Sequence, residues 1–392
     1  MRKITANTIY PVSAAPIKNG VVVLDDTGKI LSIDQRADHD LSSLEVHQGA
    51  IVPGFINTHC HLELSHMKGK VDTGTSLIPF ITNVVKFRDI PQEEIIAAIE
   101  LADQKMYEGG IVAVGDISNK ADTFTQKAKS PIRYYTFVEM FDFLQNSWAP
   151  TEFKKYKEVY DNRIEGNGNK FSCVPHAPYT VSEKLFELIN EANDNHRTVS
   201  IHNQETPDED QLFLNKTGDF VDFYKGFNIS LDTFQPTGRS SIDYAMKFMN
   251  PNCRTLFVHN TITTRQDIEQ AHQWSENVYW ATCPNANLYI ENRMPDYQHF
   301  IDTKARMTIG TDSLTSNWQL SILDEMKAIS KYQSYVPFET ILKWATLNGA
   351  EALGFEAELG SIEIGKRPGL NLLNLNEANR IHQDTKVQRL PT

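Results

Sequence analysis

The sequence has few cysteines, no basic tract and no long apolar run, and each absence excludes a class of protein. None of the cysteines forms a CxxC pair, so we expect neither a disulfide framework nor a thiolate zinc site. The net charge of −12 includes no cluster of lysine and arginine, which argues against a nucleic-acid partner. No segment approaches the ~20 apolar residues of a membrane span, and no signal peptide is evident. We therefore expect a cytoplasmic protein without a membrane partner.

What the sequence does contain is a series of eight short apolar runs separated by segments of helical periodicity. Several runs are almost continuously hydrophobic, as expected for parallel strands that are covered on both faces. After Pro91, for example, apolar residues recur on one helical face as far as Gly109. Eight alternations of strand and helix predict an α/β fold, a (β/α)8 or TIM barrel over residues 51–354. The runs are 51–58, 111–116, 133–141, 171–175, 198–201, 255–258, 278–281 and 307–310.

Several other segments have patterns of their own. Residues 20–30 read as a β-hairpin with its turn at 26–28, and we expect residues 1–50 and 355–392 to join in a small composite β-sandwich domain. Thr180 and Glu183 have the spacing of a capping box, and 319–330 reads as an amphipathic helix. The polar stretch 204–239 is a long excursion after the fifth run, of a length that is more often functional than accidental.

Histidines are concentrated where the predicted strands end, which is the face that carries the active site in a barrel of this type. His59 and His61 close the first run. Because side chains alternate along a strand, both imidazoles can point toward one metal ion. A lone histidine at a strand end is usually structural, but this many together indicate a metal-dependent hydrolase. The residues that follow later runs are His176, His202, His259 and Asp312.

Seven motifs resemble, in their order and spacing, those of the amidohydrolase superfamily. The resemblance covers nearly the whole chain and points to the cytosine-deaminase-like and chlorohydrolase-like branch, which includes aminofutalosine and other purine or nucleoside deaminases. Two positions depart from the pattern: Asn260 stands where the branch often has cysteine, and Gly369 where an acidic residue is usual. The motifs are PGFINTHCHLELS (53–65), PHAPYT (175–180), HNQE (202–205), VHN (258–260), TCPNANLYI (282–290), GTDSLTSN (310–317) and GSIEIGKRPG (360–369).

The resemblance implies one divalent metal ion per chain, held by His59, His61, His202 and Asp312. Imidazole nitrogen and carboxylate oxygen suit zinc, with iron or nickel as alternatives. Members with two metal ions use a carboxylated lysine, often on the fourth strand, and residues 172–176 contain none. Asp312 would also accept or orient a proton of the attacking water.

The resemblance also implies roles for residues around the metal. Glu205 would be the acid–base residue that protonates a ring nitrogen of the substrate, although it could instead be one exposed acid among 208–210. His259 would hydrogen-bond the attacked group or bind a second metal ion. His176 would contact the substrate or tether its loop. Glu63 would bind an N–H group of the substrate or pair with Arg88.

The activity expected from this resemblance is hydrolytic deamination of an aminated purine-like or nucleoside-like heterocycle. Two alternatives would use the same site, namely opening of a cyclic amide of the imidazolone or hydantoin type and displacement of halide. A third belongs to another class, a barrel that binds without catalysis. The expected partner is a small-molecule substrate, and a homodimer is expected by analogy with relatives.

Overall fold

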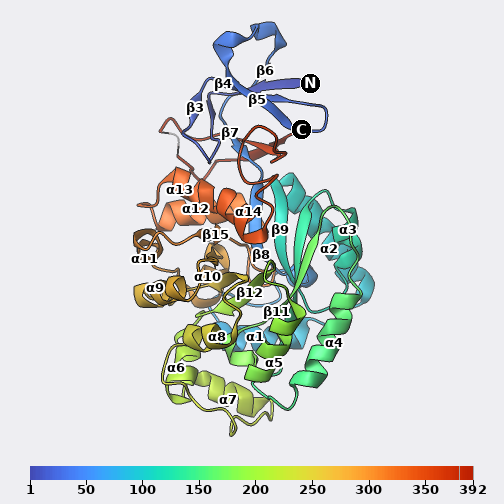
Figure 1. Cartoon of the computed structure of the whole chain (residues 1–392), viewed down its shortest axis with the longest axis vertical. Helices are drawn as coiled ribbons and strands as arrows, with labels where there is room; N and C mark the ends of the chain where they lie inside the picture. The colour runs from blue at the N-terminus through green and yellow to red at the C-terminus, as the bar shows by residue number, and fades with distance from the viewer. Residues whose placement is uncertain (379, 392) are drawn as a thin grey trace.

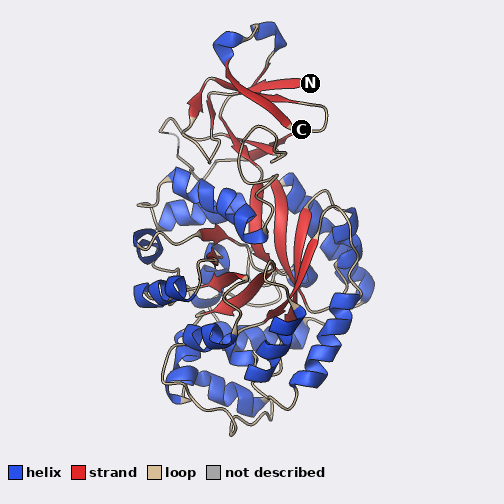
Figure 2. Ribbon diagram, viewed as in Figure 1, coloured by secondary structure: helices blue, strands red, loops and turns tan. Residues whose placement is uncertain are grey.

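The computed structural model describes residues 1–378 and 380–391, and these form two parts. A small β part holds both termini, and a larger part of strands and helices lies below it in Figure 1. In Figure 2 the helices of the larger part lie around its strands. Within the described residues, no helix has both the length and the apolar character that crossing a membrane requires.

Eight parallel strands form the centre of the larger part. They pair in two four-stranded sheets, in the orders β11-β10-β9-β8 and β12-β13-β14-β15. The sheets also meet at both remaining edges, where His202 N donates to His176 O (2.9 Å) and Thr311 N donates to His59 O (2.9 Å). The predicted α/β class is confirmed, and the arrangement is of the TIM-barrel type. The strands are β8 (Phe55–Cys60), β9 (Ile111–Ser118), β10 (Arg133–Met140), β11 (Lys170–Pro175), β12 (Thr198–Asn203), β13 (Arg254–His259), β14 (Val278–Thr282) and β15 (Met307–Ile309).

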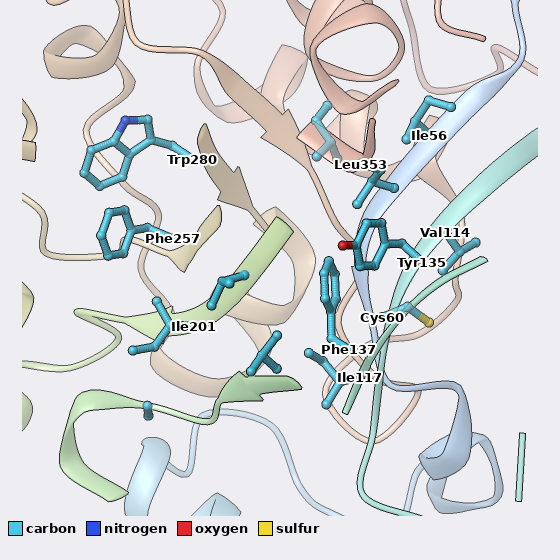
Figure 3. Packing of buried hydrophobic residues seen from close by; sticks show 14 of the residues in the cluster. Ile56, Cys60, Val114, Ile117, Tyr135, Phe137, Ile201, Phe257, Trp280 and Leu353 are labelled. Atoms are coloured by element: carbon cyan, nitrogen blue, oxygen red, sulfur yellow. The ribbon is translucent and has the colours of Figure 1, made fainter. Parts of the chain in front are cut away.

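Most buried apolar side chains on these strands belong to one large cluster (Figure 3), and a smaller cluster combines residues of β13 and β14, including Leu256 and Tyr279. Phe257 of β13 and Trp280 of β14 lie side by side with ring centroids 5.1 Å apart, and Tyr135 and Phe137 of β10 stack at 4.8 Å. The Phe257–Trp280 contact therefore adds packing to the hydrogen bonds between β13 and β14, whereas the Tyr135–Phe137 stack lies within one strand.

Helices follow the strands along the chain. The helix expected after Pro91 is α2, and its predicted apolar face is buried. The excursion at 204–239 contains α6 and α7, which the sequence did not predict as helices. The helices are α1 (Leu77–Phe87), α2 (Gln92–Glu108), α3 (Phe124–Lys129), α4 (Ala149–Asp161), α5 (Glu183–Ala192), α6 (Pro207–Asn215), α7 (Asp219–Gly226), α8 (Ser241–Phe248), α9 (Arg265–Trp274), α10 (Pro284–Glu291), α11 (Tyr297–Asp302), α12 (Ile322–Tyr332), α13 (Phe338–Trp344) and α14 (Leu347–Leu353).

Two expected helix starts differ from the observed ones. The residue that caps α5 is Ser182, whose hydroxyl accepts from Leu185 N, whereas Thr180 lies in the preceding 3-10 turn. Ser182 is held there by Asp142, whose Oδ1 accepts from Ser182 N at 2.8 Å. The helix expected at 319–330 begins at Ile322, because the hydroxyl of Ser321 caps its first turn.

The first apolar run, expected as one strand over 51–58, is two strands in different sheets. β7 (Ala50–Pro53) pairs with β16 (Leu370–Leu373) and β2 (Thr8–Ile9) in the small β part, whereas β8 begins at Phe55. The chain passes between the two parts at Gly54, where a Cβ atom would lie 2.3 Å from Val112 Cγ1. β7 therefore ends at Pro53 and β8 begins at Phe55, and the close packing at the residue between them leaves no room for a side chain.

The small β part combines both ends of the chain in two sheets. The predicted hairpin is present, with its turn closed by Asp25, whose Oδ1 accepts from the backbone of Thr27 and Lys29. Buried residues from both chain ends, including Ile4 and Leu370, share one apolar cluster. The sheet orders are β5-β4-β1-β6 and β17-β16-β7-β2-β3, with β1 (Arg2–Thr5), β3 (Ile17–Lys18), β4 (Gly20–Leu24), β5 (Ile30–Gln35), β6 (Glu45–Val46) and β17 (Val387–Leu390).

Replacing Gly54 with alanine should destabilise the protein, because the new Cβ would lie 2.3 Å from Val112 Cγ1 and 2.6 Å from Pro368 O. Overpacking of this kind costs about 1–3 kcal/mol, and we expect the free energy of unfolding in urea to fall by that amount. Gly226→Ala is the control, since a Cβ there meets nothing within 4 Å. Equal stabilities of the two variants would contradict this view of the junction.

Candidate metal and substrate site

Four side chains converge at the carboxyl ends of three strands, and they are the four that the sequence predicts as metal ligands. His61 Nε2 lies 3.2 Å from His59 Nε2 and 3.3 Å from His202 Nε2. Asp312 Oδ1 lies 3.5 Å from His59 Nε2 and 3.4 Å from His61 Nε2. Three imidazole nitrogens and one carboxylate oxygen thus face a common point, and this donor set suits a divalent cation such as zinc.

The charge states of these groups also suit metal binding. Burial lowers the pKa of His59, of His61 (to about 3) and of His202, so all three imidazoles are neutral at pH 7. Burial by itself would raise the pKa of Asp312, but the neighbouring histidines hold it well below its usual range. A neutral imidazole and an ionised carboxylate are the forms that bind metal.

Hydrogen bonds fix the orientation of two of the four groups from behind. His202 Nδ1 lies 2.8 Å from His176 O, to which it donates. The second oxygen of Asp312 accepts from the hydroxyl of Ser316 at 2.6 Å. Such outer contacts orient ligands and raise metal affinity. The sequence did not single out Ser316, although it lies in the predicted loop motif 310–317.

Glu205 and His259 form a second buried pair beside the four convergent groups. His259 Nε2 lies 3.6 Å from Glu205 Oε2, while its Nδ1 lies 2.8 Å from Asn287 Oδ1. Tyr179 OH donates to Glu205 Oε1 at 3.2 Å. Burial raises the pKa of Glu205 to about 8, so the carboxyl group retains its proton at neutral pH. Glu205 is 7% exposed, which rules out its being an exposed acid of the excursion.

The segment that carries Glu205 is anchored by an acid that sequence reasoning grouped with exposed residues. Glu209, in the first turn of α6, is fully buried. Its two carboxylate oxygens accept from Gln204 N and Glu205 N, each at 3.0 Å. The signal in the sequence was Pro207, which favours a helix start and so places Glu209 where it can reach back to the preceding loop.

Three residues at or just after strand ends in this site have left-handed backbone conformations. The φ angles are 72° at His259, 57° at Asn260 and 58° at Asp312. Such angles cost energy in non-glycine residues and tend to occur at functional sites, where surrounding contacts enforce them. Asn260, the departure noted in the sequence, supplies such contacts, because its Nδ2 donates to Phe257 O (2.9 Å) and Ala281 O (3.0 Å).

Glu63 pairs with Arg88, which is one of the two arrangements that the sequence left open, the other being a contact with the substrate. Its Oε1 lies 3.5 Å from Arg88 NH2, and its Oε2 accepts from Asn119 N at 3.0 Å. Arg88 and Asn119 line the cavity described next, whereas Glu63 supports them from behind. His176, in contrast, lines the cavity directly, with its Nδ1 2.7 Å from Thr180 Oγ1.

A cavity of about 240 Å³ opens above the convergent side chains. Its inner end is polar, and His61, His202, Glu205, His259 and Asp312 contribute to it. Its outer walls are apolar and come mainly from α1 and from the end of α7. The apolar lining residues include Leu77, Phe80, Val84, Phe141, Phe223 and Phe227.

Comparisons with known proteins agree with this site. A family model described as the amidohydrolase family matches residues 50–390. The chain is 29% identical over 360 residues to the adenosine deaminase of Helicobacter pylori. The alignment covers 90% of this chain and 85% of that protein.

Two solved structures are similar along almost the whole chain. The aminofutalosine deaminase of Helicobacter pylori in complex with methylthio-coformycin has a TM-score of 0.81 and 25% identity, and the alignment covers 96% of this chain and 93% of that one. An adenosine deaminase from Xanthomonas campestris with bound zinc has a TM-score of 0.74 and 23% identity, with coverages of 96% and 85%. The second likeness shows the fold alone.

Removing one imidazole should abolish metal binding. We expect the purified protein to carry about one zinc ion per chain and the His202→Ala variant to carry less than about one tenth of that amount, because three donors hold the ion far less tightly than four. Elemental analysis after dialysis measures the content. His196→Ala is the control, since His196 is exposed. Full zinc content in His202→Ala would show that the metal site lies elsewhere.

Proposed function

The chain belongs to the amidohydrolase family, and we propose that it is a metal-dependent deaminase that replaces the 6-amino group of an adenine nucleoside with oxygen. Hydrolysis of a carbon–nitrogen bond outside peptides agrees with the family and with the deaminases that resemble the chain. The observation that carries the proposal is the buried Glu205–His259 pair beside the four convergent ligand groups. A metal site and an acid–base pair at the end of one cavity are the two parts that hydrolytic deamination needs.

The ligands of the metal in this proposal are His59, His61, His202 and Asp312. Zinc is favoured because a structurally similar adenosine deaminase contains it and because three imidazoles and a carboxylate suit it. A zinc ion bound here supplies Lewis acidity, which lets water lose a proton near neutral pH. A second ion would call for a carboxylated lysine on the fourth strand of the barrel, β11. The single lysine of β11, Lys170, instead bonds to Gly354 O at a distance from the site, which supports one ion per chain.

Different side chains in the site carry out the different proton transfers of the reaction. Glu205 donates its proton to a ring nitrogen of the substrate, and Tyr179 keeps the carboxyl group oriented. Asp312, oriented by Ser316, accepts a proton from the attacking water and passes it to the amino group, which leaves as ammonia. In the tautomer that donates from Nδ1 to Asn287, His259 has an unprotonated Nε2, which accepts a hydrogen bond from the attacking water. The products are a 6-oxo nucleoside and ammonia.

The walls of the cavity favour a nucleoside with an apolar group at the 5′ position. Phe80 and Val84 of α1 face the cavity with Phe223 and Phe227 from the excursion. Among the described residues that line it, Arg88 is the only cation, and Glu63 already pairs with it. A phosphate group would therefore lose hydration without gaining a partner. The methylthio group of the ligand bound to the similar Helicobacter pylori enzyme has the apolar character that this wall suits.

We further infer a closed (β/α)8 barrel, supported by the hydrogen bonds at both edges where the two sheets meet. The junction with the small β-sandwich lies at Gly54, because β7 pairs within the small part. A cytoplasmic homodimer stays a prediction.

The substrate proposal predicts ammonia release from adenine nucleosides. We expect 5′-methylthioadenosine and 5′-deoxyadenosine to be deaminated with the highest kcat/KM, and AMP at least about 10-fold more slowly, because its phosphate would be desolvated against the apolar wall. Coupled ammonia assays with these substrates measure the rates. Ring-opened acids from cyclic amides, with no ammonia from any adenine nucleoside, would contradict deamination.

Glu205→Gln should lower kcat by about 10²–10⁴-fold, since general acid–base catalysis contributes that much, while zinc content stays unchanged. In the wild type, kcat/KM should fall as pH rises through about 8, because Glu205 then loses the proton that it donates. The slow residual rate of Glu205→Gln should lack this fall. Asp222→Asn, at an exposed acid of α7, is the control, and an undiminished rate in Glu205→Gln would refute the assignment.

A further inference from the structure

A fully buried ion pair lies next to the strand that carries His59 and His61. Lys127 of α3 places its Nζ 2.6 Å from Asp116 Oδ2 on β9. The ammonium group also donates to Ser118 Oγ (3.0 Å) and Thr136 Oγ1 (3.1 Å), so its hydrogen-bonding capacity is filled. Burying two charges is costly even when they are paired. An ion pair in this position therefore calls for a role beyond filling space.

The other oxygen of Asp116 reaches the metal-binding strand. Asp116 Oδ1 accepts from Leu62 N at 2.7 Å, and Leu62 is the residue directly after His61. At Leu62 the chain leaves the strand direction and begins the 3-10 helix Leu62–Met67. Asp116 also lies in register with Cys60, the residue between the two histidines. The carboxylate thus holds the point at which the backbone turns immediately after the second imidazole.

The two histidines of this strand lack the support that the other groups receive from behind. His202 is held through Nδ1 by His176 O, and Asp312 through Oδ2 by Ser316. Among the described residues, in contrast, the buried Nδ1 of His59 has no hydrogen-bond partner, and His61 makes its ring contacts through Nε2 alone. Apart from their packing against each other and against His202, the two rings therefore depend for their orientation on the backbone that carries them.

We propose that Asp116 is a positioning residue for the metal site, which fixes the backbone after His61 through Leu62 N while Lys127 holds the carboxylate in place. The chain of contacts runs from Lys127 on α3 through Asp116 on β9 to the end of β8. This inference rests on the proposed metal site, and it concerns how tightly the chain binds zinc rather than which substrate it deaminates.

The test compares two double variants that both remove the ion pair and differ in whether the side chain at position 116 can accept a hydrogen bond from Leu62 N. Asp116→Asn with Lys127→Met keeps an oxygen that can accept from Leu62 N. Asp116→Leu with Lys127→Met has a side chain of similar size without that oxygen. Replacing both members of a buried ion pair with neutral groups is tolerated far better than replacing one, which is why Lys127 is changed in both proteins.

Zinc affinity is measured by competition with a chromophoric chelator, and thermal unfolding of the metal-free proteins is measured alongside. We expect the asparagine variant to bind zinc within about threefold of the wild type and the leucine variant to bind it about 10–100-fold more weakly, the range found for lost outer contacts. The two variants should unfold at similar temperatures. A purely structural role would lower both unfolding temperatures without separating the two affinities.

Equal zinc affinities in the two double variants would overturn the proposal. Asp116→Val with Lys127→Met replaces the leucine variant if that one does not fold. If neither apolar version folds, the acceptor serves the fold as a whole and the proposal is rejected. A wild-type protein that binds no zinc would instead contradict the metal site itself, and a protein that binds zinc but releases no ammonia would contradict only the deaminase assignment.

Discussion

Three neutral imidazoles and one carboxylate approach one another at the end of the strands, and the site depends on the cation that this arrangement suits. His61 Nε2 lies 3.2 Å from His59 Nε2 and 3.3 Å from His202 Nε2, and in the unprotonated form that binds metal such nitrogens repel each other unless a cation lies between them. A divalent ion converts that repulsion into coordination. The left-handed backbone at Asp312 and the burial of His59, His202 and Asp312 are costs that the fold sustains to keep these groups together.

Hydrogen bonds from several distant segments of the chain hold this centre in place. Ser316 and His176 O hold ligands directly, Glu209 holds the backbone of Glu205, and Asp116 holds the backbone after His61. Each support is a polar group that makes a hydrogen bond to the part of the site that it orients. In the proposed function, the apolar walls from α1 and α7 limit access of water to the acid–base pair and favour a substrate with an apolar group.

The sequence predicted the centre of the site better than its supports. Strand alternation brings His59 and His61 to one side, and a polar residue at the end of an apolar run marked His202, His259 and Asp312. It could not show that the run at 51–58 serves two sheets, because an apolar pattern does not identify the neighbouring strand.

Nor could the sequence distinguish Glu209, which is buried, from the exposed acids beside it. The hydrogen-bond partners of Asp116 and of Ser316 could not be predicted either, because a hydrogen bond of this kind produces no pattern in the sequence.

The most direct test of the account is X-ray absorption spectroscopy of the zinc-loaded protein, which reports the atoms bound to the ion. We predict three imidazole nitrogens and oxygen ligands at about 2.0–2.2 Å and no sulfur. A sulfur shell at about 2.3 Å would show that Cys60 or Cys283, both buried beside the site, binds the metal. That result, or fewer than three imidazoles, would contradict the central claim.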